Sequence, residues 1–571
     1  MLDRRGHSGI SFLSMGLVAG GLMAAVVAIP DVAFAMQFKY GNADISFDTT
    51  ISAGAAMRTS GRKCMYISVA NPQGCANDGL TDNYDDGNLN YDKWDVFSAP
   101  VSGLSELEVK LEDFGFFMRG SYFFDTIQSD KNSTRRTDLT DAAVSRVGRR
   151  ARLLDAYVYG DVDMGVPVHF RLGNQVINWG ESIFYGGGIA ETNAFDVTKL
   201  RGAGAEIKEA FLPAPMALVR FAPVSNLDVS AYYQFRWNET ELDPVGTFFS
   251  LEDAVGPGAV GLFYGPAFGG FGDPAASGVD AQTQFLLGTG IPLVADQRPS
   301  HSGQWGVSAL YFSEMLQTEL GLYYMRYHQK VPVVGAFAAC DPIFGCYPTA
   351  YFRNYVPDQD LFGASASFVW QDISFGVDVA YQPDYAIPLA DPFTAAATTA
   401  FLVDPVGFTG TAVDQGFIRE NRTQTILNAL YSAGPAAPVF GTVIRTFGMD
   451  DITFIGEMAW THFDSKPAGT FGHSNAVGYI LDITGSYQGV FGTPWVLYPG
   501  LSFRHDVNGT ALDYAMTDSH IDARRQVTLR LNADYQSTWA LGVSYTRNSG
   551  GGYMNFSRDR DFATVTVSYA F

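Results

Sequence analysis

Residues 227–237 read Leu-Asp-Val-Ser-Ala-Tyr-Tyr-Gln-Phe-Arg-Trp, and this stretch decides the fold class. Every second residue from Leu227 to Trp237 is apolar or aromatic, and mostly polar residues stand between them. A period of two places successive side chains on opposite faces of a β-strand. The stretch therefore predicts a strand with one apolar and one polar face.

The same alternation recurs in residues 105–112, 114–125, 373–381 and 527–535. After the N-terminal region, no window offers the roughly 18 apolar residues that a spanning helix needs. Backbone groups in lipid must be paired within the protein, which leaves a closed barrel. We expect an all-β, transmembrane antiparallel β-barrel; a large soluble β-sandwich or β-propeller is the alternative.

The C-terminus supports the barrel. Residues 563–571 read Ala-Thr-Val-Thr-Val-Ser-Tyr-Ala-Phe, and the apolar face ends at Phe571. This resembles the terminal strand that the bacterial barrel-assembly machinery recognises, so we expect that machinery as a partner through Phe571.

A coarse count gives 18 strands, an even number as bacterial barrels require, with 14 to 20 left open. The expected strands are 42–58, 104–112, 114–126, 153–162, 166–177, 214–222, 226–238, 302–313, 318–329, 360–370, 372–383, 422–432, 451–464, 476–487, 494–505, 525–536, 538–547 and 561–571. Residues 433–450 could hide another pair or a bend.

The connections are of two kinds. Short turns such as Gln371-Asp372 and Gln536-Ser537 suit the periplasmic side. Long segments suit the extracellular side: 59–103, 127–152, 239–301, 330–359, 384–421, 506–524 and 548–560. Their length predicts a plug, a cap or inward-folded loops on a single domain.

The N-terminus reads as a targeting segment. Arg4 and Arg5 precede an apolar run over about 15–29, and Ala33-Phe34-Ala35 matches a cleavage site. We expect a signal peptide over 1–35 and a mature barrel over 36–571 in the cell outer membrane. A membrane anchor is the alternative.

Composition narrows the function classes. Charged residues make up 17% of the 571 residues, aromatics 14%, and the net charge is −22. Average soluble domains hold about 25% charged residues. The aromatic content excludes a disordered chain, and the acidity argues against a nucleic-acid partner.

The polar faces of the strands supply candidates for the pore lining. We expect these lumen or constriction residues: Glu106, Glu108, Lys110, Glu112, Arg119, His169, Arg171, Gln175, Asp228 and Arg236. Rings of charge set the selectivity of a channel. A register slip of one residue would invert each face.

Two segments lack strand alternation. Residues 137–152 predict a short helix with Arg146, Arg149 and Arg150 on one face. This helix is either a solvated turn or a basic patch for lipopolysaccharide phosphates or an anionic solute. The second segment follows Gln175 and is expected to fold into the pore, through Trp179, Glu181, Ser182, Asp196, Lys199 and Arg201.

Several motifs carry a family resemblance. They are Asp85-Asp-Gly-Asn-Leu-Asn-Tyr91, Phe123-Phe-Asp125, Leu153-Leu-Asp-Ala-Tyr-Val-Tyr-Gly160 and Gly173-Asn-Gln-Val-Ile-Asn-Trp-Gly-Glu-Ser182. The chain resembles a large family of proteobacterial outer-membrane proteins catalogued only as a domain of unknown function. The resemblance implies an outer-membrane barrel, an association with hydrophobic compounds and an association with transporters of the resistance-nodulation-division type. It assigns no functional residue.

Cysteines, acidic residues and histidines offer further candidates. Cys64 with Cys75 and Cys340 with Cys346 predict two loop disulfides. The acidic stretch with Asp78, Asp82, Asp85, Asp86, Asn88, Asn90 and Asp92 is either a calcium site or a solvated loop. His505-Asp506 and Ser519-His520 with Asp522 are the best rim candidates for hydrolysis, yet motifs for catalysis are missing and we expect neither an enzyme nor a cofactor.

Nearly uncharged loops suggest the function. Residues 255–272, Val331–Ala339 and Pro392–Val403 hold almost no charge. Exposed apolar patches often bind ligands, so we expect a passive outer-membrane channel for hydrophobic or amphipathic small molecules. The loops could instead pack on each other as a lid. The alternatives are a water-filled porin with a charged constriction and a structural partner of a periplasmic or envelope-spanning transport system.

Overall fold

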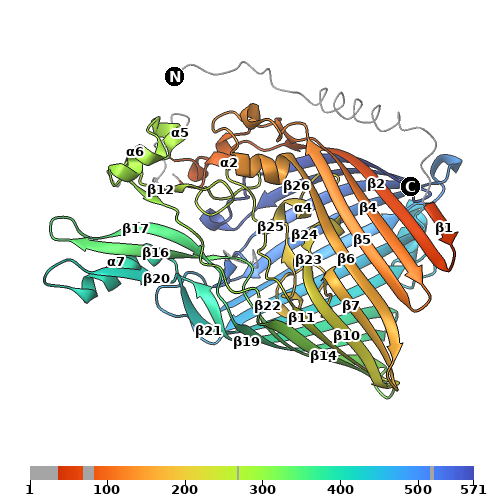
Figure 1. The fold of residues 1–571 in the computed structure, drawn as a ribbon. Coiled ribbons are helices and arrows are strands. Elements are labelled where there is room, and N and C mark those ends of the chain that lie inside the picture. Colours follow the sequence, from red (N-terminus) through yellow and green to blue (C-terminus); the bar gives the residue numbers. More distant parts are fainter. Residues whose placement is uncertain (1–35, 69–82, 267–268, 515–519) are drawn as a thin grey trace.

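The computed structural model describes residues 36–68, 83–266, 269–514 and 520–571. The predicted signal peptide lies outside these residues. Eighteen antiparallel strands form the closed barrel (Figure 1), and the short strands β1 (Met36–Tyr40) and β3 (Val96–Ser98) join the same sheet by pairing with β2. The barrel strands are β2 (Ala43–Arg58), β4 (Pro100–Leu111), β5 (Phe114–Asp125), β6 (Arg149–Asp163), β7 (Pro167–Gln175), β10 (Ala214–Val224), β11 (Leu227–Gln234), β14 (Gln304–Ser313), β15 (Thr318–Tyr327), β18 (Gln359–Trp370), β19 (Ile373–Pro388), β21 (Phe417–Ala433), β22 (Asp451–Phe463), β23 (Asn475–Ser486), β24 (Trp495–Asn508), β25 (Arg525–Tyr535), β26 (Trp539–Ser549) and β27 (Phe562–Ala570).

The barrel closes where β2 meets β27. Their register runs from Thr50 opposite Ala570 to Arg58 opposite Phe562. Phe571 extends the seam, because its backbone N–H donates to Thr49 O at 2.9 Å and its carbonyl accepts from Thr49 N at 2.8 Å. The predicted terminal strand is therefore β27, which closes the barrel against β2.

The alternation that predicted the strands separates the outside of the barrel from the inside. On β25, Leu529 and Leu531 are 53% and 48% exposed on the outer face. Arg530, between them, points inward and bonds Asp482 of β23. Each of the 18 predicted ranges overlaps one barrel strand, so the predicted fold class and strand number are confirmed.

Two predicted elements differ from the structure. Strand β11 ends at Gln234, although the alternation continues to Trp237. Trp237 is buried and donates its indole N–H to Gln329 O at 3.2 Å, so tertiary packing ends the strand early. Residues 433–450 hold the helix α8 (Gly441–Phe447) rather than another strand pair.

The short turns lie at one end of the barrel. Gln371 and Asp372 have φ of 48° and 66°, and Gln536 and Ser537 have φ of 54° and 56°. Two consecutive residues with positive φ are typical of a tight hairpin whose twist matches its strands.

The long segments at the other end carry structure of their own. Strands β16 (Val333–Asp341), β17 (Gly345–Asn354) and β20 (Thr411–Asp414) form a small sheet outside the barrel. Helix α7 (Pro392–Val403) packs on this sheet, and the unit projects from the barrel (Figure 1). These segments were predicted only as loops.

No helix in the described ranges is long and apolar enough to cross a membrane.

Candidate functional site

Residues 176–213 between β7 and β10 cross the lumen, and we name them the inward segment. The N–H groups of Glu181 and Ser182 donate to Asp378 Oδ2 of β19 at 2.8 and 3.1 Å. Asp378 is buried on the inner face of the wall. The segment that was predicted to fold into the pore is thus bonded to a strand on another side of the barrel.

A second carboxylate binds the tip of the inward segment, the name that we give to residues 181–185. The N–H groups of Ile183, Phe184 and Tyr185 donate to Glu457 of β22 at 2.5, 2.8 and 2.6 Å. A buried N–H group without an acceptor costs about 1–3 kcal/mol. The two carboxylates therefore fix the tip by satisfying five successive backbone donors.

Aromatic packing fixes the start of the inward segment. Trp179 contacts the rings of Tyr232 and Tyr323 at centroid distances of 5.1 and 5.7 Å. Further along, Tyr185 stacks on His520 at 5.4 Å. The family-type block ending at Ser182 is therefore the part of the chain that enters the lumen.

Ion pairs join the inward segment to the wall formed by β4, β5 and β6. Arg119 Nε lies 2.5 Å from Glu106 Oε1, and its Nη1 lies 2.8 Å from Asp155 Oδ2. Lys208 of the inward segment lies 3.0 Å from the same Glu106 oxygen. Glu106 and Arg119 were predicted for the lumen, and Lys208 was one of the charges expected to pair with the barrel wall; Asp155 was missed.

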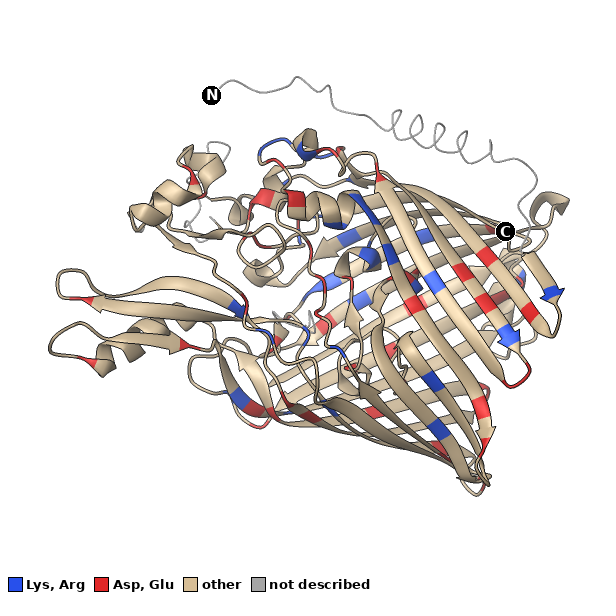
Figure 2. Ribbon diagram, viewed as in Figure 1, with Lys and Arg blue, Asp and Glu red and all other residues tan. Residues whose placement is uncertain are grey.

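A second cluster lies further toward the long loops. Glu241 binds Arg146 and Arg150 at 2.7 Å each and also binds Arg152. Asp196 of the inward segment lies 3.7 Å from Arg152. Burial would raise the pKa of Glu241, but the hydrogen bond from Arg150 and the three positive charges lower this pKa to about 2. Figure 2 shows blue and red bands on the strands of this part of the barrel. We name the inner face of β4, β5 and β6, which carries both clusters, the ion-paired wall.

The inner surface on the other side of β2 from the ion-paired wall has different chemistry. On β25, β26 and β27, inward hydroxyl groups bond one another: Thr528 with Thr546 at 2.9 Å and Ser544 with Thr564 at 2.6 Å. Within the described ranges, none of these four hydroxyls is hydrogen-bonded to the inward segment. We name this surface the hydroxyl wall.

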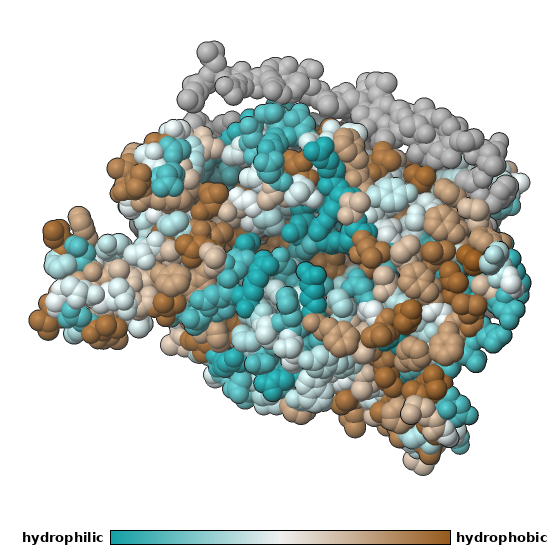
Figure 3. Space-filling model, viewed as in Figure 1, coloured by the Kyte–Doolittle hydropathy of each residue, from teal (hydrophilic) through white to brown (hydrophobic). Residues whose placement is uncertain are grey.

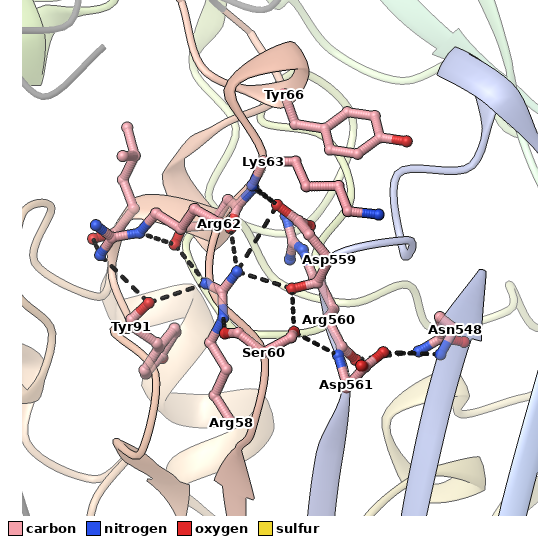
Figure 4. Close-up of polar contacts among 12 residues, drawn as sticks. Arg58, Ser60, Arg62, Lys63, Tyr66, Tyr91, Asn548, Asp559, Arg560 and Asp561 are labelled. Carbon is pink, nitrogen blue, oxygen red and sulfur yellow. Dashed lines mark hydrogen bonds and ion pairs between the residues drawn. The ribbon is translucent and has the colours of Figure 1, made fainter. Parts of the chain in front are cut away.

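The motif over 85–91 locks the loops above the barrel seam. Arg58 donates to Asn88 Oδ1 at 2.7 Å, to Tyr91 O at 2.9 Å and to Asp559 O at 2.8 Å (Figure 4). A Cβ on Gly87 would lie 2.5 Å from Thr247 O, so only glycine fits there. The motif thus ties three distant loops together and is structural.

The chain belongs to the family described as "Protein of unknown function (DUF1302)". The family model matches residues 15–571. The suspected family is therefore confirmed, and it brings no assigned activity.

The structure is also similar to solved structures at low identity. One is the outer membrane protein opdK from Pseudomonas aeruginosa, with 9% identity, a TM-score of 0.40 and coverage of 92% of this chain and 98% of the other. Another is a BenF-like porin from Pseudomonas fluorescens Pf-5, with 10% identity, a TM-score of 0.39 and coverage of 92% and 98%. A search of curated proteins found no match.

Other predicted lumen residues lie along the inner wall. Glu108 accepts a hydrogen bond from the Tyr159 hydroxyl at 2.5 Å, and the Arg171 guanidinium lies 5.5 Å from the Tyr157 ring. Gln175 is fully buried and donates to Met216 O at 3.0 Å. Gln175 therefore fixes the start of the inward segment.

The remaining predicted lumen residues lie away from these clusters. Glu112 is in the turn after β4, and Lys110 is near the same turn. His169 pairs with Asp161 at 3.1 Å, and Asp228 with Arg220 at 2.7 Å, both near short turns. Arg236 is exposed beyond the end of β11. The structure does not bring these five residues together with Glu106 and Arg119.

The remaining inward-loop candidates have partners of their own. Lys199 lies 3.5 Å from Glu209 and 3.9 Å from the centre of the Phe123 ring. Arg201 binds Asp243 and lies over the Phe249 ring. These contacts join the inward segment to β5 and to the loop after β11.

The predicted helix over 137–152 is much shorter. Only Asp141–Gly148 is helical, and Arg149 already begins β6. The strand geometry sends Arg150 and Arg152 inward to Glu241, while Arg149 is exposed on the other face. The predicted basic face of Arg146, Arg149 and Arg150 is therefore wrong.

The acidic loop is already neutralised by arginines. Arg136 lies 3.2 Å from Asp85 and 3.7 Å from Asp86, and it also binds Asp273. Burial, and then the charge of Asp273, raise the pKa of Asp86 to about 8. Asp92 binds Arg62 at 2.7 Å. Asp78 and Asp82 lie outside the described residues.

Cys340 and Cys346 form the predicted disulfide, at the tip of the β16–β17 hairpin rather than in a loop without strands. Cys75, the predicted partner of Cys64, lies outside the described residues, so that disulfide stays a prediction.

Of the hydrolase candidates, Asp506 and His520 lie close together, because Asp506 Oδ2 accepts from the N–H of Ile521 at 2.9 Å, whereas His505 points to the other face of β24. His505 lies on the outer face of β24 beside Tyr479, at a ring distance of 5.6 Å. His520 lies inside against Tyr185, and Asp506 accepts from Arg524 at 2.7 Å. Ser519 lies outside the described residues.

Proposed function

We propose that this protein is a passive channel of the outer membrane for small molecules, and that solutes pass between the inward segment and the hydroxyl wall. The carrying observation is the difference between the two walls of the lumen. Lys208 and Asp196 of the inward segment form ion pairs with Glu106 of β4 and Arg152 of β6, whereas the hydroxyls of β25–β27 bond one another.

The outer surface supports placement in a membrane. Large apolar side chains are exposed on strands around the barrel, including Leu172, Leu322, Val369, Leu529 and Val543. Lipid-facing side chains of a spanning barrel alternate with lumen-facing polar ones in this way. Exposure of this kind in water would favour aggregation.

The lumen favours polar or amphipathic solutes, and thus the porin alternative. Hydroxyl groups and charge pairs line the inner wall, as in channels that select by charge. The nearly uncharged loops lend little support to apolar capture, because Val255, Val334 and Phe393 from the three loops pack into one cluster around Tyr351. The lid interpretation describes these loops better.

Two measurements test this function. Fractionation of cells should place the protein in the outer membrane, and the purified barrel in planar bilayers should give small, discrete conductance steps. A protein that stays soluble without detergent, or a folded barrel that gives no steps, would contradict the proposal. The assembly machinery and a periplasmic transport partner stay predictions.

A further inference from the structure

The outer wall contains a groove that the channel does not use. It has a volume of about 380 Å³ and lies on the lipid-facing side of β2, β4, β5 and β6. Its lining is mainly apolar: Phe47, Leu107, Met118, Tyr122, Ala151 and Leu153. In Figure 3 the surface over these strands is largely brown and white.

A β-bulge makes the groove. The pairing of β5 with β6 shifts between Met118 opposite Ala156 and Gly120 opposite Leu153, so two residues of β6 face Arg119 alone. A bulge bends the strand and breaks the ladder locally. Gly120 lines the groove, and a Cβ there would have one neighbour within 4 Å, Arg152 O at 3.6 Å. The groove therefore lies where Gly120 leaves the outer wall without a side chain.

A cation lies beyond one end of the groove. Arg149 shares the outer face of β6 with Ala151 and Leu153, about 7 Å along the strand from Ala151. Arg149 is opposite Phe124, at the end of the wall away from the short turns. Within the described ranges, the exposed Arg149 side chain makes no hydrogen bond or ion pair, whereas Arg146, Arg150 and Arg152 all bind Glu241.

We propose that this groove binds one acyl chain of a lipopolysaccharide molecule whose phosphate binds Arg149. The proposal rests on the placement of the barrel in the outer membrane given above. An apolar slot below a free guanidinium matches a lipid with acyl chains and a phosphorylated headgroup in the extracellular leaflet. Arginine binds phosphate through paired N–H donors. The channel would thus carry a lipid at a defined position on its wall.

The test uses the purified, delipidated full-length barrel in detergent. Purified lipopolysaccharide is added, and the bound amount is measured by native mass spectrometry. Gly120→Leu fills the groove and should weaken binding at least about tenfold, a factor that corresponds to ~1.4 kcal/mol. Arg149→Gln should weaken it by a similar factor, and the double variant should add little because both changes remove one bound molecule.

Two control variants carry the same changes elsewhere. Gly456→Leu adds a side chain on another part of the wall, where the Cβ would meet only the flexible end of Leu481 at 3.2 Å. Arg445→Gln removes an exposed arginine in α8, at the short-turn end. Both should bind lipopolysaccharide like the wild type. Heat-dependent migration in gels verifies that every variant is folded.

Wild-type binding by folded Gly120→Leu would overturn the proposal, as would equal binding of phosphatidylglycerol and lipopolysaccharide by the wild type. The channel function fails separately, through fractionation or through missing conductance. A conducting outer-membrane barrel with unchanged lipid binding in Gly120→Leu contradicts the lipid site alone.

Discussion

The ion-paired wall and the hydroxyl wall face the same lumen with different chemistry. On β4–β6, charged groups reach across to the inward segment, as Glu106 does to Lys208. On β25–β27, Ser and Thr hydroxyls bond sideways along the sheet. The ion-paired wall holds the inward segment in place, because its charged groups bind that segment. The hydroxyl groups of the other wall bind one another, so the surface of that wall stays accessible to solutes. The comparison supports the proposed solute path along β25–β27.

Release of the tip of the inward segment should have the largest effect. In the double variant Asp378→Ala with Glu457→Ala, five backbone N–H groups lose their acceptors. The tip then leaves its position, and single-channel conductance should rise several-fold. Asp482→Ala removes a lumen carboxylate that binds Arg530 and not the inward segment. It should leave conductance close to the wild-type value, and an equal rise in both variants would show a general loss of charge instead.

Narrowing the passage along the hydroxyl wall should have the next largest effect on conductance. Ser544→Trp places an indole on the inner face of β26 and should at least halve the conductance. Val543→Trp makes the neighbouring change on the lipid face, where Val543 is 56% exposed, and should have no effect. If both variants conduct like the wild type, the path does not follow this wall.

Glu241 should set the ionic selectivity beside the ion-paired wall. Glu241→Gln leaves Arg146, Arg150 and Arg152 with one fewer negative charge. The reversal potential in a salt gradient should shift toward anions. Glu239→Gln, two residues away, weakens the contacts with the exposed Arg298 and the Tyr355 hydroxyl and should leave the potential unchanged.

The same carboxylate predicts a modest pH effect on stability. The pKa of Glu241 is about 2 in the folded chain, because Arg150, Arg152 and Arg146 outweigh the effect of burial, and it is about 4.3 in an unfolded chain. The unfolded chain binds more protons between these values, so the stabilisation present above about pH 4.3 is lost as pH falls toward about 2. The difference in urea unfolding free energy between wild type and Glu241→Gln should shrink over that window. A difference that stays constant from pH 6 to pH 2.5 would contradict this pKa.

The sequence predicted the barrel far better than its contents. Lipid on one side and lumen on the other impose a period of two, and that local signal located every barrel strand. It misled only where tertiary contacts intervene, as at Trp237 beneath Gln329. The lumen anchors carry no such signal, because Glu457 and the N–H groups that it binds are more than 270 residues apart.

The lumen residues were predicted only in part for the same reason. Strand parity pointed Glu106 and Arg119 inward, and they do meet. Parity could not show that Lys208 joins them, since its place depends on how the inward segment folds. The predicted helix over 137–152 was wrong because the arginines that suggested one helical face belong mostly to β6, where neighbouring residues point to opposite sides.

The most direct test of the solute path is the reaction of engineered cysteines with a small, charged thiol reagent during single-channel recording. Ser544→Cys on the hydroxyl wall should be modified and its current should fall in a step. Ser121→Cys, buried on the ion-paired wall, and Val543→Cys, on the lipid face, should keep their current. If the current of Ser544→Cys stayed unchanged while the current of Ser121→Cys fell, solutes would pass along the ion-paired wall. That result would contradict the proposed path.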